Sequence, residues 1–203
     1  MKKYLKILFA FLLLIGALAA FIFLQNSLSL FKDSKYNAHK VERPAYNFRL
    51  QNHKGEPVSL ANFLGQNIFI TFGYSECKTV CPANMAVFKD LRKQVKGLAA
   101  TRFEFLFVDI DHENTTKEKL NHFLEMFNID VVGLIGGEDK TLDVARKYNA
   151  FVDYNPRVKE INHPGFIYFV DKKGVLQLIY LKSILVKEII NDLEQMKRDG
   201  FQL

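Results

Sequence analysis

The feature that most constrains the fold is a pair of cysteines placed where a strand should end and a helix should begin. Cys77 and Cys81 are the only cysteines in the chain, and they lie in the segment Gly-Tyr-Ser-Glu-Cys-Lys-Thr-Val-Cys-Pro at residues 73–82. An apolar run at residues 68–72 precedes them, and Pro82 is well suited to the first turn of a helix. Residues four apart share one face of a helix, so the two sulfurs should lie about one turn apart. Such a pair can exchange with a disulfide or bind a soft metal ion.

The rest of the chain alternates between strand and helix patterns. Continuous apolar runs predict buried strands at residues 67–74 and 103–110, and apolar residues at helical spacing predict a helix between them at 83–95. This order is typical of an α/β thioredoxin-like fold, with a central mixed sheet flanked by helices. The same patterns predict the remaining elements, namely a hairpin at 48–60, a helix at 115–127, a short strand at 131–135, a helix at 142–148, a hairpin at 166–180 and a helix at 184–196.

The amino-terminal segment predicts one transmembrane helix. Three lysines among the first six residues are followed by eighteen uncharged residues, 7–24, and a spanning helix needs about 17 to 25. A cleaved signal peptide is the alternative, because Ala17-Leu18-Ala19 resembles a small-residue cleavage site. The apolar stretch continues past that point, however, which favours an uncleaved anchor. The lysines favour a cytoplasmic amino terminus.

The chain should consist of three parts. We expect a cytoplasmic stub with its anchor at residues 1–26, a polar tether at 27–44 and one globular domain at 45–203, because about 160 residues can bury a single core.

The distribution of charge argues against a nucleic-acid partner. The formal net charge is +6, but residues 1–43 hold seven basic and two acidic residues, against 21 and 20 in the remainder. The globular part therefore has no positive field that would attract DNA or RNA.

The cysteine motif and the order of the elements together resemble the Sco/SenC family of copper-binding proteins with a thioredoxin fold. The resemblance covers about residues 48–193 and includes the Cys-x-x-x-Cys-Pro signature and the strand that ends at Asp109. It also includes His163, which lies where that family has a histidine ligand of copper. The resemblance therefore implies a metal site formed by Cys77, Cys81 and His163.

Members of that family are membrane-tethered factors that assemble the dinuclear copper centre of cytochrome c oxidase, and some also act on thiols. The resemblance implies a copper chaperone in the bacterial inner membrane, with its globular domain in the periplasm. The implied partners are the copper-bearing subunit of cytochrome c oxidase and a periplasmic thioredoxin-like reductant or copper donor.

The ligand chemistry itself favours copper over zinc. Thiolates select Cu(I), and an imidazole also suits Cu(II), whereas closed zinc sites normally use four protein ligands. The cysteines should also be a redox-active pair, because a disulfide between Cys77 and Cys81 would remove both thiolates and prevent copper binding. A helix amino terminus lowers the pKa of a thiol. We therefore expect Cys81 to be the more enclosed thiol and to have the lower pKa.

Three alternatives remain open. A periplasmic thiol-disulfide oxidoreductase would need both cysteines but not His163, and Pro164 would then be the cis-proline that such enzymes place opposite their cysteines. A peroxide-reducing enzyme would need one dominant cysteine, and an inert structural disulfide would gain little from closing so short a loop. Asp109 and Asp111 are candidate groups behind the ligands. The other histidines are expected to be solvated, namely His39, His53, His112 and His122.

Overall fold

The computed structural model describes two units of the chain separately, Met1–Lys35 and Tyr36–Leu203. In the first unit, residues 14–18 are helical, and most of the predicted anchor at 7–24 lies outside the described residues. No helix in the described part of the chain is both long enough and apolar enough to cross a membrane. The described residues are 14–18, 35–98, 102–150, 153–155, 160–181 and 183–203.

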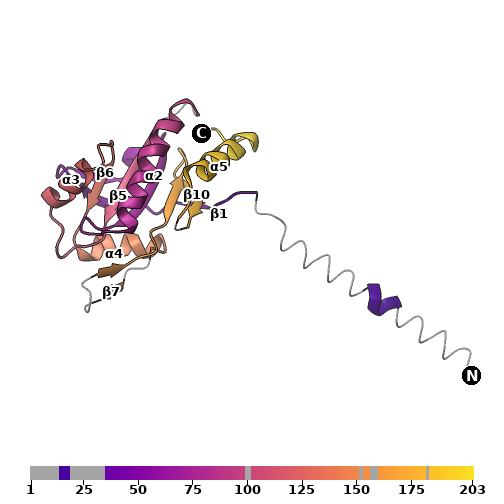
Figure 1. Ribbon diagram of the computed structural model, residues 1–203, viewed down its shortest axis with the longest axis horizontal. Helices are drawn as coiled ribbons and strands as arrows, with labels where there is room; N and C mark the ends of the chain where they lie inside the picture. Colours follow the sequence, from indigo (N-terminus) through magenta and orange to yellow (C-terminus); the bar gives the residue numbers. More distant parts are fainter. Residues whose placement is uncertain (1–13, 19–34, 99–101, 151–152, 156–159, 182) are drawn as a thin grey trace, which may run out of the picture. The chain divides into compact units, whose positions relative to one another are not determined.

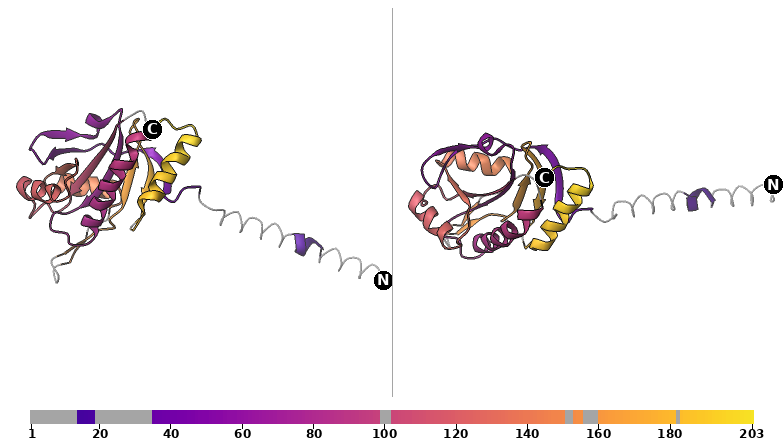
Figure 2. Two further views of the ribbon diagram at one scale, coloured as in Figure 1. Left: turned by 45° about the horizontal axis from the view of Figure 1, so that its top comes forward. Right: turned by 90° about the horizontal axis from the view of Figure 1, so that it is seen from above.

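The folded unit is a mixed sheet with helices on its faces (Figures 1 and 2). The strands of the main sheet are β1 (His39–Pro44), β2 (Arg49–Asn52), β3 (Pro57–Ser59), β4 (Asn67–Gly73), β5 (Phe103–Asp109), β6 (Val132–Ile135), β9 (Ile167–Val170) and β10 (Val175–Tyr180). Two further strands, β7 (Asp153–Asn155) and β8 (Glu160–Asn162), form a separate small sheet. The longer helices are α2 (Val80–Gln94), α3 (Lys117–Glu125), α4 (Glu138–Lys147) and α5 (Val186–Arg198).

The main sheet has the order β1-β10-β9-β4-β5-β6-β2-β3, with parallel strands at its centre. β4 pairs in parallel with β5 and antiparallel with β9, and all residues of these three strands are buried. In Figure 2, α2 and α5 lie along one face of the sheet and α4 along the other. At the carboxyl ends of the central strands, Gly73 is the register partner of Asp109. The cysteine loop therefore leaves the sheet beside a buried carboxyl group.

Helix α2 begins earlier than the sequence predicts. Its first residue is Val80 rather than one after Pro82, so Cys81 lies inside the first turn. Pro82 is tolerated there because the first four N–H groups of a helix have no partner within it. The side chains of Met85, Phe88 and Leu91 are fully buried, as their helical spacing predicts.

The predicted tether is wrong over its second half. Tyr36 and Ala38 are buried, and residues 39–44 form β1, which pairs antiparallel with β10. Most residues of β1 are exposed, and its register shifts between Lys40 and Arg43. An exposed, irregular edge strand with charged side chains has little apolar alternation, so its sequence resembles a polar linker. The first half of the predicted tether lies outside the described residues.

The other predicted elements are confirmed, with ends that differ by a few residues. The hairpins at 48–60 and 166–180 are the antiparallel pairs β2–β3 and β9–β10. Helix α3 begins after Thr116, whose side chain accepts a hydrogen bond from the backbone N–H of Lys119. Sequence analysis did not predict the small β7–β8 sheet, which precedes His163.

Candidate metal centre

The loop between β4 and α2 places the two cysteine side chains together. The backbone N–H of Cys77 donates to the carbonyl of Tyr74 at 3.1 Å, which turns the chain back toward the sheet. The backbone N–H of Cys81 donates to Sγ of Cys77 at 3.4 Å. Both cysteines are free thiols, and Cys77 is 7% exposed while Cys81 is 1% exposed. The expectation that Cys81 is the more enclosed thiol is therefore confirmed.

His163 joins the two thiols from the segment between β8 and β9. Its Nε2 lies 3.7 Å from Sγ of Cys81, and its ring is half-buried. The ring of Tyr74 packs against it edge to face, with centroids 5.9 Å apart. One ligand atom from each of Cys77, Cys81 and His163 lies within 4.8 Å of the others. The structure thus brings together all three predicted ligand residues.

Two glycines leave room for this arrangement. A Cβ atom at Gly73 would lie 2.5 Å from Sγ of Cys81 and 3.0 Å from the ring of Phe107. Gly165 has a φ of +63°, and a Cβ atom there would overlap the side chain of Val80. Both positions therefore require glycine, one against the sulfur of Cys81 and one against the side chain of Val80.

The order of the two thiol pKa values is opposite to the prediction. The pKa of Cys77 is lowered, chiefly because the Cys81 side chain hydrogen-bonds to its sulfur, and also because His163 and the Cys81 backbone N–H do so. The pKa of Cys81 is raised by that same contact with Cys77, by burial and by the charge of Cys77. The amide at the start of α2 points at the sulfur of Cys77, so the helix terminus favours the thiolate of Cys77.

Asp109 lies beneath the cysteine loop and anchors it. Its carboxylate accepts hydrogen bonds from the backbone N–H of Ser75 at 3.0 Å, the backbone N–H of Asp111 at 2.9 Å and the hydroxyl of Thr115 at 2.8 Å. Burial raises the pKa of Asp109 to about 7, although these hydrogen bonds oppose the rise. The side chain of Asp111 instead accepts from Asn114, so of the two candidate acids it is Asp109 that supports the loop.

The remaining histidines lie apart from the thiols. His53 is half-buried, and its Nδ1 accepts a hydrogen bond from the backbone N–H of Gly133 at 3.1 Å. Burial lowers the pKa of His53, and this residue lies outside the group of potential metal ligands. His39 and His122 are exposed, and His112 is half-buried. Among the described residues, the single group of three or more potential metal ligands is the one around the cysteines.

Pro164 does not follow the pattern of a thiol oxidoreductase. No peptide bond in the described part of the chain is cis, and this includes the bond before Pro164. Pro164 is therefore not the cis-proline that the oxidoreductase alternative would place opposite the cysteines.

Two residues that the sequence does not single out lie next to the predicted ligands. Tyr74 contacts the imidazole of His163, and Asn84 is a buried polar residue on α2, three positions after Cys81. A polar residue at the buried spacing of an otherwise apolar helix face is the signal that would have identified Asn84.

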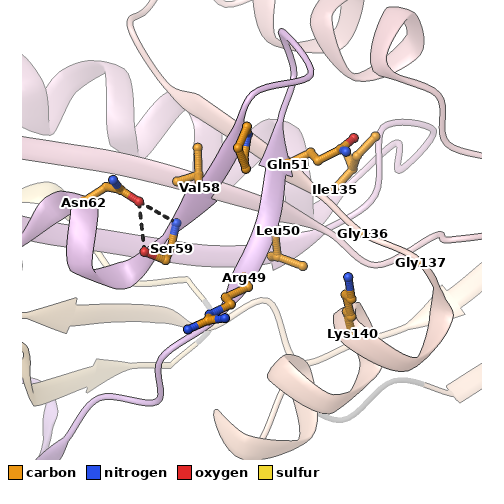
Figure 3. Close-up of a pocket in the computed structure, with 11 residues that line it drawn as sticks. Arg49, Leu50, Gln51, Val58, Ser59, Asn62, Ile135, Gly136, Gly137 and Lys140 are labelled. Atoms are coloured by element: carbon orange, nitrogen blue, oxygen red, sulfur yellow. Dashed lines mark hydrogen bonds between the residues drawn. The ribbon is translucent and has the colours of Figure 1, made fainter.

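A separate pocket of about 680 Å³ lies at the β2–β3 edge of the main sheet (Figure 3). It is formed by β2, β3 and the start of α4, and its lining includes Leu50, Gly137 and Lys140. At its rim the side chain of Asn62 accepts hydrogen bonds from the backbone N–H and the hydroxyl of Ser59. None of the three predicted metal ligands lines this pocket.

Comparison with known proteins identifies one family. A family model described as SCO1/SenC matches residues 37–198. The mitochondrial SCO1 homologue of Homo sapiens is 30% identical over 132 residues, which are 63% of this chain and 44% of the human protein. A SCO2-like protein of Rickettsia prowazekii is 27% identical over 199 residues, or 91% of this chain and 93% of that protein. The match thus spans less than half of the human protein and nearly all of the bacterial one.

Solved structures show the same fold. The copper-bound ScoI of Arabidopsis thaliana has a TM-score of 0.69 at 18% identity, covering 76% of this chain and 98% of that one. The copper-bound ScoI of Bradyrhizobium japonicum has a TM-score of 0.65 at 23% identity, covering 75% and 98%. A SCO1/SenC family lipoprotein of Bacillus anthracis has a TM-score of 0.69 at 21% identity, covering 78% and 97%. The predicted thioredoxin-like arrangement of sheet and helices is confirmed.

Proposed function

The chain belongs to the SCO1/SenC family, and from this premise we propose that it binds one copper ion through Cys77, Cys81 and His163. It delivers that copper for assembly of the dinuclear copper centre of cytochrome c oxidase. The observation that carries the proposal is the convergence of two sulfurs and one imidazole nitrogen within 4.8 Å of one another. Two relatives of the same fold are structures with copper bound, and a third is described as a member of a family of cytochrome c oxidase assembly proteins.

The donor set fits copper chemically. Two thiolates form a soft pair that suits Cu(I), and the imidazole adds a donor that also suits Cu(II). The lowered pKa of Cys77 makes its thiolate available, while Cys81 has to release its proton when the metal binds. Three donors leave the ion open to a further ligand, so a partner protein can take it by ligand exchange.

The proposed location follows from the amino-terminal sequence. Residues 7–24 anchor the protein in the bacterial inner membrane as a single-pass helix, with a cytoplasmic amino terminus and a periplasmic globular domain. The eighteen uncharged residues of this segment and the preceding lysines support this topology. In the periplasm a thioredoxin-like reductant keeps the two cysteines reduced, because their disulfide cannot bind copper.

Copper titration of the reduced full-length chain tests the proposed site. We expect one Cu(I) or one Cu(II) per chain, loss of tight Cu(II) binding in His163→Ala, and loss of both metals in Cys77→Ser and Cys81→Ser. His122→Ala is the control, because this histidine is exposed on α3 and outside the ligand group. Copper binding that is absent, or that does not change without His163, would refute the three-ligand site.

A thiol-disulfide oxidoreductase is the second candidate, and the lowered pKa of Cys77 favours it. The Cys77 thiolate would attack a partner disulfide to form a mixed disulfide and release one partner thiolate. Cys81 would then displace the second partner thiolate, leaving the partner reduced by two electrons and this chain with a Cys77–Cys81 disulfide. This function needs both cysteines but not His163, so reduction of a disulfide-containing peptide by His163→Ala distinguishes it from the chaperone.

A further inference from the structure

Within the described residues, the hydrogen bonds of the His163 imidazole go only to the cysteine sulfurs, and no group outside this cluster orients the ring through Nδ1. Its Nε2 faces Sγ of Cys81 at 3.7 Å, and its Nδ1 is buried with no hydrogen-bond partner in that part of the chain. A ligand histidine normally donates its second ring N–H to a carboxylate, carbonyl or water, and this bond fixes the ring. In this chain the position of the ring has to come from its backbone and from the packing of Tyr74.

A buried polar side chain holds that backbone. Nδ2 of Asn84 donates to the carbonyl of Gly165 at 3.0 Å and to Oγ1 of Thr71 at 2.8 Å. The hydroxyl of Thr71 in turn donates to the carbonyl of Phe166 at 3.0 Å. Two consecutive carbonyls, beginning two residues after His163, are thereby fixed to α2 and β4.

We propose that Asn84 is a positioning residue for the metal site, which holds the loop of His163 at the correct distance from Cys77 and Cys81. It lies on the first turns of the helix that carries Cys81, so one side chain couples the sulfur-bearing helix to the imidazole-bearing loop. The inference rests on the proposed copper site, because it explains what holds His163, the third proposed ligand, close to the two cysteines.

The segment between the carbonyl of Gly165, which Asn84 binds, and the ring of His163 is short and stiff. Pro164 separates His163 from Gly165 and has a fixed φ. Gly165 lies against the side chain of Val80 with no room for a Cβ atom, so the segment has little freedom to shift while its carbonyl stays bonded. Loss of the Asn84 bond would release the carbonyl of Gly165 and widen the range of positions open to the imidazole.

Loss of the Asn84 hydrogen bond should lower the affinity for Cu(II) more than the affinity for Cu(I). The two thiolates suffice to retain Cu(I), whereas Cu(II) depends more on the imidazole donor. Mutation of a residue that orients a ligand typically lowers metal affinity about 10- to 100-fold. We therefore expect Asn84→Ala to weaken Cu(II) binding by that factor and to change Cu(I) affinity much less.

The test compares metal-site variants with a matched control in the full-length protein. Asn84→Ala removes the hydrogen bonds that Asn84 donates to Gly165 and Thr71. Thr71→Val removes the hydroxyl of Thr71 while keeping the size of the side chain, and Thr71→Ser retains the hydroxyl. Asn52→Ala is the control, since Asn52 is as buried as Asn84, at 8% exposure, but supports the turn at residues 52–56 far along the sheet. The readouts are Cu(I) and Cu(II) affinities by competition, the thiolate-to-Cu(II) absorption bands, and the ring NMR signals of His163 in the metal-free protein.

We expect Asn84→Ala and Thr71→Val to lose Cu(II) affinity, shift the absorption bands and broaden the His163 ring signals, while Thr71→Ser and Asn52→Ala resemble the wild type. The inference is overturned if Asn84→Ala keeps the Cu(II) affinity and spectrum of the wild type, or if Asn52→Ala loses as much. Failure of the wild type to bind copper would refute the proposed function itself. This outcome differs from failure of the Asn84 inference, because it is seen in the wild type before any variant is compared.

Discussion

The sulfur of Cys81 occupies the space that a side chain at position 73 would need. In Gly73→Ala the new methyl group would meet that sulfur at 2.5 Å and the ring of Phe107 at 3.0 Å. Because this core is closely packed, the sulfur has to move, and overpacking of this kind typically costs about 1–3 kcal/mol. We expect a lower free energy of unfolding, measured by urea denaturation. We also expect at least a tenfold loss of copper affinity, measured by competition, because the displaced sulfur no longer meets the metal in the right position.

Gly97→Ala provides the matched control for that change. Gly97 is exposed, has no atom within 4 Å of the position of an added Cβ, and does not require a positive φ. It should change neither copper affinity nor stability by more than a few tenths of a kcal/mol. Equal copper affinity in Gly73→Ala and the wild type would show that the sulfur has more room than the structure gives it.

The buried carboxyl group of Asp109 predicts a pH dependence of stability. Its pKa is about 7 in the folded protein because of burial, and about 3.9 in an unfolded chain. Between these values the folded state holds a proton that the unfolded state has lost, so the free energy of unfolding falls as pH rises from about 4 to 7 and is then constant. At about 1.4 kcal/mol per pKa unit, we expect this contribution to be on the order of 4 kcal/mol.

Asp109→Asn removes the titrating group while keeping its size, and therefore isolates the effect. Urea denaturation of the metal-free protein at several pH values between 4.5 and 7.5 should give a steeper fall for the wild type than for the variant. Parallel pH profiles for the two proteins would mean that Asp109 is already ionised throughout this range.

At this scale the sequence predicted which three side chains lie together but not the state of the two sulfurs. The cysteine spacing and the distant His163 were sufficient to select Cys77, Cys81 and His163, whose ligand atoms lie within 4.8 Å of one another. The relative pKa of the thiols depends chiefly on the hydrogen bond between the two cysteine side chains, and the N–H of Cys81 adds to the lowering at Cys77. The roles of Asn84 and Thr71 likewise depend on contacts between residues more than eighty positions apart.

At the scale of elements, one buried aspartate holds the start of β1 against α5. Asp192 is almost fully buried, and its carboxylate accepts hydrogen bonds from the backbone N–H and side chain of Asn37 and from the backbone N–H of Ala38, all at 2.8–2.9 Å. In Asp192→Ala these donors lose their acceptor, and the buried N–H of Ala38 alone costs about 1–3 kcal/mol as an unsatisfied group. We expect a stability loss of about 2 kcal/mol or more and faster hydrogen exchange of the β1 amides.

Asp143→Ala serves as the comparison for that variant. Asp143 is a half-buried residue of α4 whose side chain is 51% exposed and pairs with Lys147 at 2.6 Å, and such surface pairs contribute less than about 1 kcal/mol. If Asp192→Ala and Asp143→Ala were equally stable, β1 would not depend on the carboxylate of Asp192.

The elements that the sequence predicts correctly are those whose burial is periodic or continuous. β4, β5 and α2 are read directly from apolar runs and helical spacing, because their side chains face the core throughout. β1 has no such pattern, since most of its residues are exposed and its hydrogen bonds are made by the backbone. An edge strand of this kind is determined by its partner β10 and not by its own residues.

At the scale of the whole molecule, the position of β1 decides where the folded domain begins. The sequence places that boundary at residue 45, whereas the compact unit starts at Tyr36. Removal of residues 1–44 would delete β1, expose the edge of β10 and break the hydrogen bond from the hydroxyl of Tyr36 to Asp199 at 2.6 Å. An unpaired strand edge also favours association between chains.

We therefore expect the fragment 36–203 to unfold cooperatively as a monomer, and the fragment 45–203 to melt on the order of 10 °C lower, since each kcal/mol lost lowers Tm by about 2–4 °C for a chain of this size. Thermal denaturation and sedimentation of the two fragments test this expectation. β1 pairs only with β10 in the described sheet, and the three proposed copper ligands lie outside β1. Fragment 45–203 should therefore bind copper wherever it remains folded. Equal melting temperatures of the two fragments would mean that residues 36–44 do not stabilise the domain and belong to the tether that the sequence alone predicts.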